Sequence, residues 1–163
     1  MSGRVSKRQD AVNEERTPAG EALSRLVVLV FRLEGALKAV GDSLARPAGQ
    51  TSARWRVLAA VESTPLSVAQ IARAWSFARQ SVQRVADELE RDGLITYEEN
   101  PGHKRAKLVQ LTPTGAAALG QIQSAQRVWA NELGSQIGAE DLARASDVLG
   151  RILDAPAMQR EPG

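Results

Sequence analysis

The chain has 163 residues, of which 43% are hydrophobic, 25% charged and only 4% aromatic. This composition fits a folded globular protein with a mainly helical core, and the length suggests one domain with flanking helices. The formal net charge of +2 and the sequence pI of about 9.4 are only a mild indication of an anionic partner.

Several kinds of site are excluded by the residues that the sequence lacks. Cysteine is absent and histidine occurs once, as His103. Disulfides, thiol redox sensing and clustered histidine or thiolate metal ligands are therefore excluded, and we expect neither a metal nor a cofactor. The longest apolar run is the short stretch 26–31, and residues 1–20 lack the apolar core of a signal peptide. We expect a cytoplasmic protein with no membrane partner.

The N-terminal part predicts an arm followed by a long helix. Residues 1–19 are polar, mixed in charge and without periodicity, so we expect a disordered arm. A helix is predicted over 21–45, within a dimerisation segment that covers 20–50. Its apolar residues recur at intervals of 4, 3, 4, 3 and 4 residues, at Leu26, Val30, Leu33, Leu37, Val40 and Leu44. Such a seam is typical of two helices packed together, and it equally fits packing on the chain's own domain.

The middle of the chain, residues 51–112, predicts three helices and then a hairpin. The first helix covers about 52–63, with Thr51 as its N-cap. Ser67 stands three residues before Gln70, the spacing of a capping box, which predicts a short helix over 68–74. A further helix over 77–92 follows almost at once and should end at Gly93 in a left-handed conformation. Strands are predicted at 94–98 and 107–111, around a basic turn at 100–105.

Two more helices are predicted in the C-terminal part, residues 113–154, which we interpret as a second dimerisation segment. Pro113 suits the first turn of a helix that runs to about 134, and Glu140 suits the positive end of a helix over 139–154. Residues 155–163 should form a flexible tail. The predicted fold is mainly α with a small β-hairpin, arranged as a winged helix-turn-helix with N- and C-terminal dimerisation helices.

The helix over 77–92 carries the side chains that could read DNA. Opposite its apolar stripe lie Gln80, Gln83, Arg84 and Asp87, with Arg79 and Ser81 on the flanks. Glutamine can pair with adenine and arginine with guanine in the major groove. Because the acidic residues gather in the second half of this helix, its N-terminal half should enter the groove. A mixed-charge helix face that is simply solvated is the competing interpretation.

The turn of the hairpin supplies positive charge for the DNA backbone or minor groove. Lys104, Arg105 and Lys107 lie within four residues. An ordinary basic loop would look the same, so the order of elements is what favours a DNA-binding wing. The complete set of predicted DNA contacts is Ser67, Ser76, Arg79, Gln80, Ser81, Gln83, Arg84, Lys104, Arg105 and Lys107.

Three segments of this region resemble the MarR family of bacterial regulators: residues 66–72 (LSVAQIA), 78–95 (ARQSVQRVADELERDGLI) and 100–115 (NPGHKRAKLVQLTPTG). The resemblance implies a homodimer in which each subunit offers one winged helix to double-stranded DNA. It also implies a repressor that releases its operator, a pseudo-palindrome, when a small organic effector binds. The sequence departs from the family at His103, where the wing usually has Asp, and at Lys104, where Arg is common.

Two other classes of function can be compared with a DNA-binding regulator. A winged helix used for protein interaction or architecture is favoured by the charge of residues 77–107, where six basic and six acidic residues cancel. The base-reading side chains favour the regulator. An enzyme is not supported, because there is no phosphate-binding glycine loop and His103 has no Ser–His–Asp arrangement around it. We predict no catalytic residues.

Overall fold

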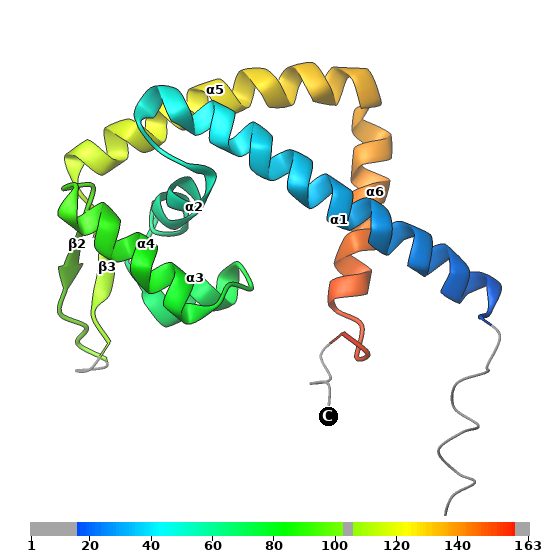
Figure 1. Cartoon of the computed structure of the whole chain (residues 1–163), viewed down its shortest axis with the longest axis horizontal. Coiled ribbons are helices and arrows are strands. Elements are labelled where there is room, and N and C mark those ends of the chain that lie inside the picture. The colour runs from blue at the N-terminus through cyan, green and yellow to red at the C-terminus, as the bar shows by residue number, and fades with distance from the viewer. Residues whose placement is uncertain (1–15, 103–105, 159–163) are drawn as a thin grey trace, which may run out of the picture. The chain divides into compact units, whose positions relative to one another are not determined.

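The computed structural model describes residues 16–102 and 106–158 (Figure 1). The predictions made for His103, Lys104 and Arg105, and those for residues 1–15 and 159–163, fall outside this range. The elements in chain order are α1 (Pro18–Ala45), a 3₁₀ turn η3 (Arg46–Ala48), α2 (Ser52–Ala60), β1 (Leu66–Ser67), α3 (Val68–Ala74), α4 (Arg79–Arg91), β2 (Ile95–Glu98), β3 (Leu108–Leu111), α5 (Pro113–Ile137) and α6 (Ala139–Leu153). The chain divides into two compact units, residues 1–41 and 42–163, and the boundary falls within α1.

Helix α1 begins at Pro18, slightly before the predicted start at residue 21. The hydroxyl of Thr17 accepts a hydrogen bond from the backbone N–H of Gly20 (3.1 Å), and proline is well suited to the first helical turn. Two residues of the predicted arm, 18 and 19, are therefore helical. Several large apolar side chains of α1 are exposed: Leu23, Val27, Val28, Leu29, Val30, Phe31, Leu33 and Leu37.

The second unit has a core in which α2, α3 and α4 pack together and against the sheet, with α5 lying on α2. Leu58 of α2, Ile71 of α3 and Leu89 of α4 are fully buried there. The three side chains come from different helices, so their burial fixes the helix-turn-helix arrangement. The predicted mainly helical winged fold is confirmed.

The capping box predicted at Ser67 is present. Its hydroxyl accepts from the backbone N–H of Gln70, and the Gln70 side chain accepts in turn from the backbone N–H of Ser67 (2.8 Å). Gly93 ends α4 at φ +73°, the left-handed conformation expected of it. Thr51 caps α2 through the N–H of Arg54. These local signals placed the helix starts correctly because each depends on residues within one turn.

The sheet has three strands in the order β1-β3-β2, all antiparallel, and not the two strands of a simple hairpin. The additional strand β1 pairs Leu66 with Val109 and Ser67 with Leu108. A two-residue strand has no periodicity that a sequence pattern could reveal, which is why the hairpin prediction missed it. Through β1, the start of α3 is tied to the base of the wing.

The start of α5 is fixed to the end of α4 by a close contact. Thr112 caps α5 by accepting from the N–H of Gly115 (3.0 Å), and its hydroxyl donates to the carbonyl of Gly93 (2.7 Å). A Cβ atom on Gly115 would lie only 1.9 Å from the carbonyl oxygen of Leu94. Only glycine permits this approach, so α5 and the root of β2 are held together at this point.

Helix α6 follows α5 after Gly138, whose φ of +97° breaks the helical path. It packs on the end of α5 and contains no buried residue. Its apolar side chains Leu142, Val148, Leu149 and Leu153 are exposed. Among the helices of the described residues, none is long and apolar enough to cross a membrane.

Candidate nucleic-acid interface

Helix α4 separates apolar and polar residues cleanly between two faces. Val82, Val85, Ala86 and Leu89 are buried against the core. Outside this buried stripe, α4 exposes five of the predicted DNA contacts: Arg79, Gln80, Ser81, Gln83 and Arg84. Ser76 is also exposed, in the turn between α3 and α4, where its φ of +52° is left-handed. The structure thus presents these six side chains on one continuous stretch of chain.

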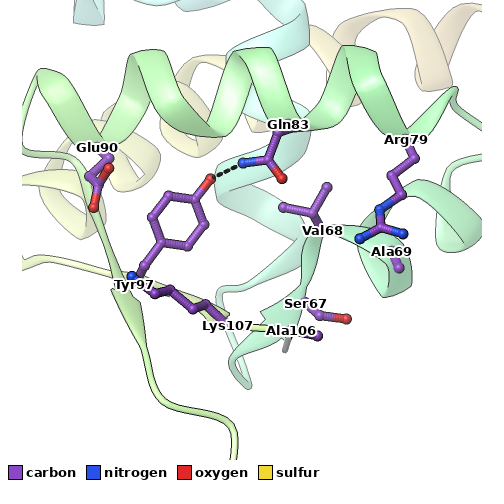
Figure 2. Close-up of a pocket in the computed structure, with 9 residues that line it drawn as sticks. All are labelled: Ser67, Val68, Ala69, Arg79, Gln83, Glu90, Tyr97, Ala106 and Lys107. Atoms are coloured by element: carbon purple, nitrogen blue, oxygen red, sulfur yellow. Dashed lines mark hydrogen bonds between the residues drawn. The ribbon is translucent and has the colours of Figure 1, made fainter. Parts of the chain in front are cut away.

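Ser67 and Lys107 are neighbours at the wing, because Ser67 pairs with Leu108 in the sheet. Ser67 is only 7% exposed and its hydroxyl is occupied by the cap of α3, so a DNA contact there remains a prediction. Lys107 is exposed just before β3. Both line a cavity of about 430 Å³ between the starts of α3 and α4 and the wing (Figure 2).

This cavity brings together four of the predicted site residues that are far apart in the sequence. Arg79 and Gln83 come from α4, Ser67 from β1, and Lys107 from the position just before β3, while Tyr97 of β2 closes one side. Two cations therefore face a shared hollow from the helix and from the wing. Glu90 also lines the hollow, so it is the part near Arg79 and Lys107 that suits a negatively charged group such as a phosphate.

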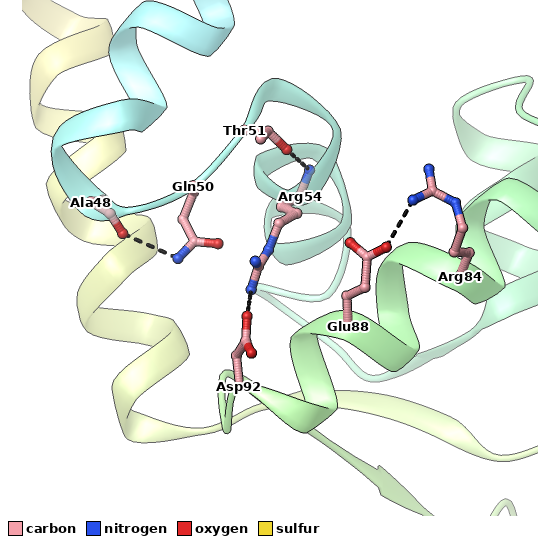
Figure 3. A network of polar contacts seen from close by, with 7 residues as sticks. All are labelled: Ala48, Gln50, Thr51, Arg54, Arg84, Glu88 and Asp92. Carbon is pink, nitrogen blue, oxygen red and sulfur yellow. Dashed lines mark hydrogen bonds and ion pairs between the residues drawn. The ribbon is translucent and has the colours of Figure 1, made fainter.

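Arg84 forms an ion pair with Glu88 one turn further along α4, with 2.8 Å between the guanidinium and the carboxylate (Figure 3). The Arg84 side chain is 70% exposed. Exposed pairs at this spacing contribute only about 0.3–0.5 kcal/mol, because water screens them. Arg84 is consequently free to exchange Glu88 for a stronger partner.

A second ion pair joins α4 to α2. Arg54 donates to the carboxylate of Asp92 at 2.5 Å, and the Arg54 side chain is only 17% exposed (Figure 3). This pair could not be predicted from the sequence, since its members are 38 residues apart. It ties the end of α4 to α2.

Gln83, Asp87 and Tyr97 form a closed hydrogen-bonded triangle between α4 and β2. The Gln83 amide nitrogen donates to Asp87 (2.7 Å) and to the hydroxyl of Tyr97 (2.8 Å), and Tyr97 donates to Asp87 (2.8 Å). Partial burial and the bond to the Asp87 carboxylate raise the pKa of Tyr97 above its ordinary value. Tyr97 was missed at the sequence level, because its pairing depends on how β2 folds back beside α4.

These contacts change how the charge of residues 77–107 is understood. Asp87, Glu88 and Asp92 each have a partner within the fold. Only the charge of Asp92 is met by a cation outside this stretch, Arg54, because Glu88 pairs with Arg84 itself and Asp87 bonds the neutral side chains of Gln83 and Tyr97. Among the described residues, no group of three or more acidic or histidine side chains is placed to hold a metal ion.

Comparison with known proteins gives the class of this fold. A mutant of MarR from E. coli, complexed with operator DNA, matches with a TM-score of 0.68 and 24% identity, over 81% of this chain and 94% of that one. CouR from Rhodococcus jostii, bound to p-coumaroyl-CoA, matches with a TM-score of 0.71 and 18% identity, over 79% of this chain and 92% of that one. The fold is that of winged-helix transcription regulators.

The sequence matches agree with the structural ones. A model of the MarR family matches residues 48–106. An uncharacterized protein of Mycobacterium tuberculosis is 36% identical over 140 residues, which make up 86% of this chain and 98% of the relative. The chain belongs to the MarR family of transcription regulators, and the resemblance noted from its sequence is confirmed.

Proposed function

We propose that the chain is a regulator that binds a specific operator in double-stranded DNA as a homodimer, with no catalytic role. The observation that carries the proposal is the exposed face of α4, where Arg79, Gln80 and Arg84 stand in the half of the helix that has no acidic residue. Guanidinium and amide groups on such a face match the pattern of donors and acceptors on base edges.

The wing complements this helix in the proposed complex. Lys107 lies across the cavity from Arg79, so the two cations suit neighbouring phosphates. Lys104 and Arg105 extend the same basic segment in the sequence, and we assign Arg105 to the adjacent minor groove. Ser76 and Ser81, at the start of α4, are suited to donate to the backbone.

The proposed dimer is supported by helices whose apolar side chains are not covered. Leu142, Leu149 and Leu153 of α6 are exposed, and α1 exposes its own row of valines and leucines. Exposed apolar area of this extent is typical of an interface between chains. A dimer also places two recognition helices on the two halves of a pseudo-palindrome, about one helical turn apart.

A role as a repressor relieved by a small organic effector completes the proposal. It is supported by family membership and by CouR, whose solved structure is bound to p-coumaroyl-CoA. The chain has no cysteine for a redox signal. We expect such an effector to be an anion or an aromatic molecule, and the protein to act in the cytoplasm, where its DNA is.

The decisive test is selection of bound duplexes from a random library, followed by binding measured against salt concentration. We expect a pseudo-palindromic consensus and an affinity that falls steeply with salt. Arg79→Ala and Lys107→Ala should each lower the salt slope by about one, whereas Arg127→Ala, on α5, should leave it unchanged. If no consensus emerges, the winged helix is a protein-interaction or architectural module.

A further inference from the structure

In the triangle of Gln83, Asp87 and Tyr97, both N–H groups of the Gln83 side chain already donate hydrogen bonds. A primary amide has two N–H groups. One is directed to the Asp87 carboxylate and the other to the Tyr97 hydroxyl. Tyr97 then gives its own hydrogen to the same carboxylate oxygen, so each donor in the ring has an acceptor.

The amide oxygen of Gln83 is left for an outside partner. Figure 2 shows the nitrogen of Gln83 facing Tyr97 and the oxygen turned away from it. In the described part of the chain, no hydrogen bond reaches this oxygen, and the Gln83 side chain is exposed. On the surface that α4 offers, Gln83 is thus an acceptor and not a donor.

We propose that Tyr97 and Asp87 are positioning residues that restrict Gln83 to accepting a hydrogen bond from a base. This inference rests on the proposed function, because it concerns how α4 reads DNA. Two bases offer a donor in the major groove, adenine through its N6 amino group and cytosine through its N4 amino group. Guanine and thymine present only acceptors at the corresponding positions. Gln83 therefore selects adenine or cytosine and does not make the two-bond contact with adenine that glutamine can form elsewhere.

The arrangement is held from both sides. Asp87 lies one turn beyond Gln83 on the same helix, so these two side chains stay adjacent. Tyr97 is fixed because its ring packs on the edge of the core from strand β2. The Tyr97 hydroxyl is protonated near neutral pH, as phenols ordinarily are, so it can donate to Asp87.

Tyr97→Phe tests the inference, because it removes one acceptor of the Gln83 amide and keeps the ring. Bound duplexes are selected from a random library with the wild-type protein and with this variant. We expect the wild-type protein to accept adenine or cytosine at one base pair of each half-site, and Tyr97→Phe to prefer adenine. Replacing that adenine by 7-deazaadenine, which lacks N7, should leave the wild-type affinity within about twofold. The same replacement should weaken Tyr97→Phe about fivefold, the value of one hydrogen bond.

Gln83→Ala, alone and combined with Tyr97→Phe, shows that the effect passes through Gln83. Both variants should lose the preference at this base pair, while Gln80→Ala should change a different one. The inference is overturned if wild-type and Tyr97→Phe select the same base, or if 7-deazaadenine weakens both equally. A selection in which neither protein enriches any duplex overturns the proposed DNA binding itself, so the two failures are distinguishable.

Discussion

The helix-turn-helix unit and the two outer helices use apolar residues in opposite ways. In α2, α3 and α4 the apolar side chains meet those of a neighbour, and Leu58, Ile71 and Leu89 are completely buried. Helix α6 is amphipathic to a degree similar to that of α4, yet it buries no residue, and α1 exposes a long row of apolar side chains. The apolar side chains of α2, α3 and α4 are therefore covered within the described chain, whereas many of those on α1 and α6 are left exposed.

Removing residues 139–163 deletes α6, and we expect this change to have the largest effect. We expect the truncated chain to keep a cooperative unfolding transition, because α6 contributes no buried residue to the core. It should no longer dimerise and should bind the selected operator weaker by orders of magnitude, since one winged helix alone makes few contacts. Sedimentation at micromolar concentration and binding to the operator measure the two effects.

A less disruptive version of the same experiment leaves α6 in place. Leu149→Glu places a carboxylate among the exposed apolar side chains of α6. Arg144→Ala, the control, removes one partner of an exposed ion pair on the same helix. Only the first should dissociate the dimer. A full-length chain that sediments as a stable monomer would contradict the assignment of α6 to an interface.

The second prediction tests the tight packing between the start of α5 and the chain that follows α4. Gly115→Ala should destabilise the fold by about 3 kcal/mol or more, because the new Cβ would collide with the carbonyl oxygen of Leu94. Gly120 is the matched control, since it lies in the same helix and a Cβ there meets nothing within 4 Å. Gly120→Ala should stabilise by roughly 0.5–1 kcal/mol. Urea unfolding of both variants measures the difference, and equal effects would show that the junction of α4 and α5 is looser than described.

The sequence predicted this fold well where the signals are local. The helix over 68–74 was placed to the residue because Ser67 and Gln70 cap it, and Gly93 ended α4 as expected. Other contacts could not be predicted, because their partners are distant in the sequence. Ser67 pairs with Leu108 in the sheet, and Arg54 reaches Asp92 across 38 residues.

In the candidate site, too, local features could be predicted from the sequence and contacts between distant residues could not. The exposed face of α4 could be deduced from helical periodicity, so Arg79, Gln80 and Arg84 were placed on it from the sequence. The partners of these residues could not be deduced. Gln83 looked like a free base-reading amide, and its connection to Tyr97 depends on how β2 folds back beside α4.

A third prediction concerns the surface of the helix-turn-helix unit, which should tolerate changes that its core does not. Arg84→Ala should relax the preference at one or two base pairs of each half-site, at about 1–3 kcal/mol of discrimination, with little change in the salt slope. Stability should change by well under 1 kcal/mol, because the lost pair with Glu88 is exposed. Affinities for single-base variants of the selected operator measure the effect. An equal loss for every duplex would mean that Arg84 contacts phosphate only.

The smallest expected effect lies where the wing meets α4. Burial and Asp87 raise the pKa of Tyr97 in the folded chain above the ordinary 10.0, so the folded state holds the phenol proton more firmly than the unfolded state does. The associated stability is complete below about pH 10 and is lost as the pH rises from there towards the folded pKa. The slope for one proton is at most about 1.4 kcal/mol per pH unit.

Tyr97 is the only tyrosine of the chain, so its titration can be followed directly by tyrosinate absorbance. The folded protein should ionise at higher pH than the same protein in urea. Urea unfolding at pH 9 and pH 11 should show a larger loss of stability for wild-type protein than for Tyr97→Phe, and lysine deprotonation cancels in that difference. A tyrosine that titrates alike in the folded and unfolded chains would mean that the triangle is open in solution. The wing would then be joined to α4 only through backbone and core, and Gln83 would again be free to read adenine with both of its polar atoms.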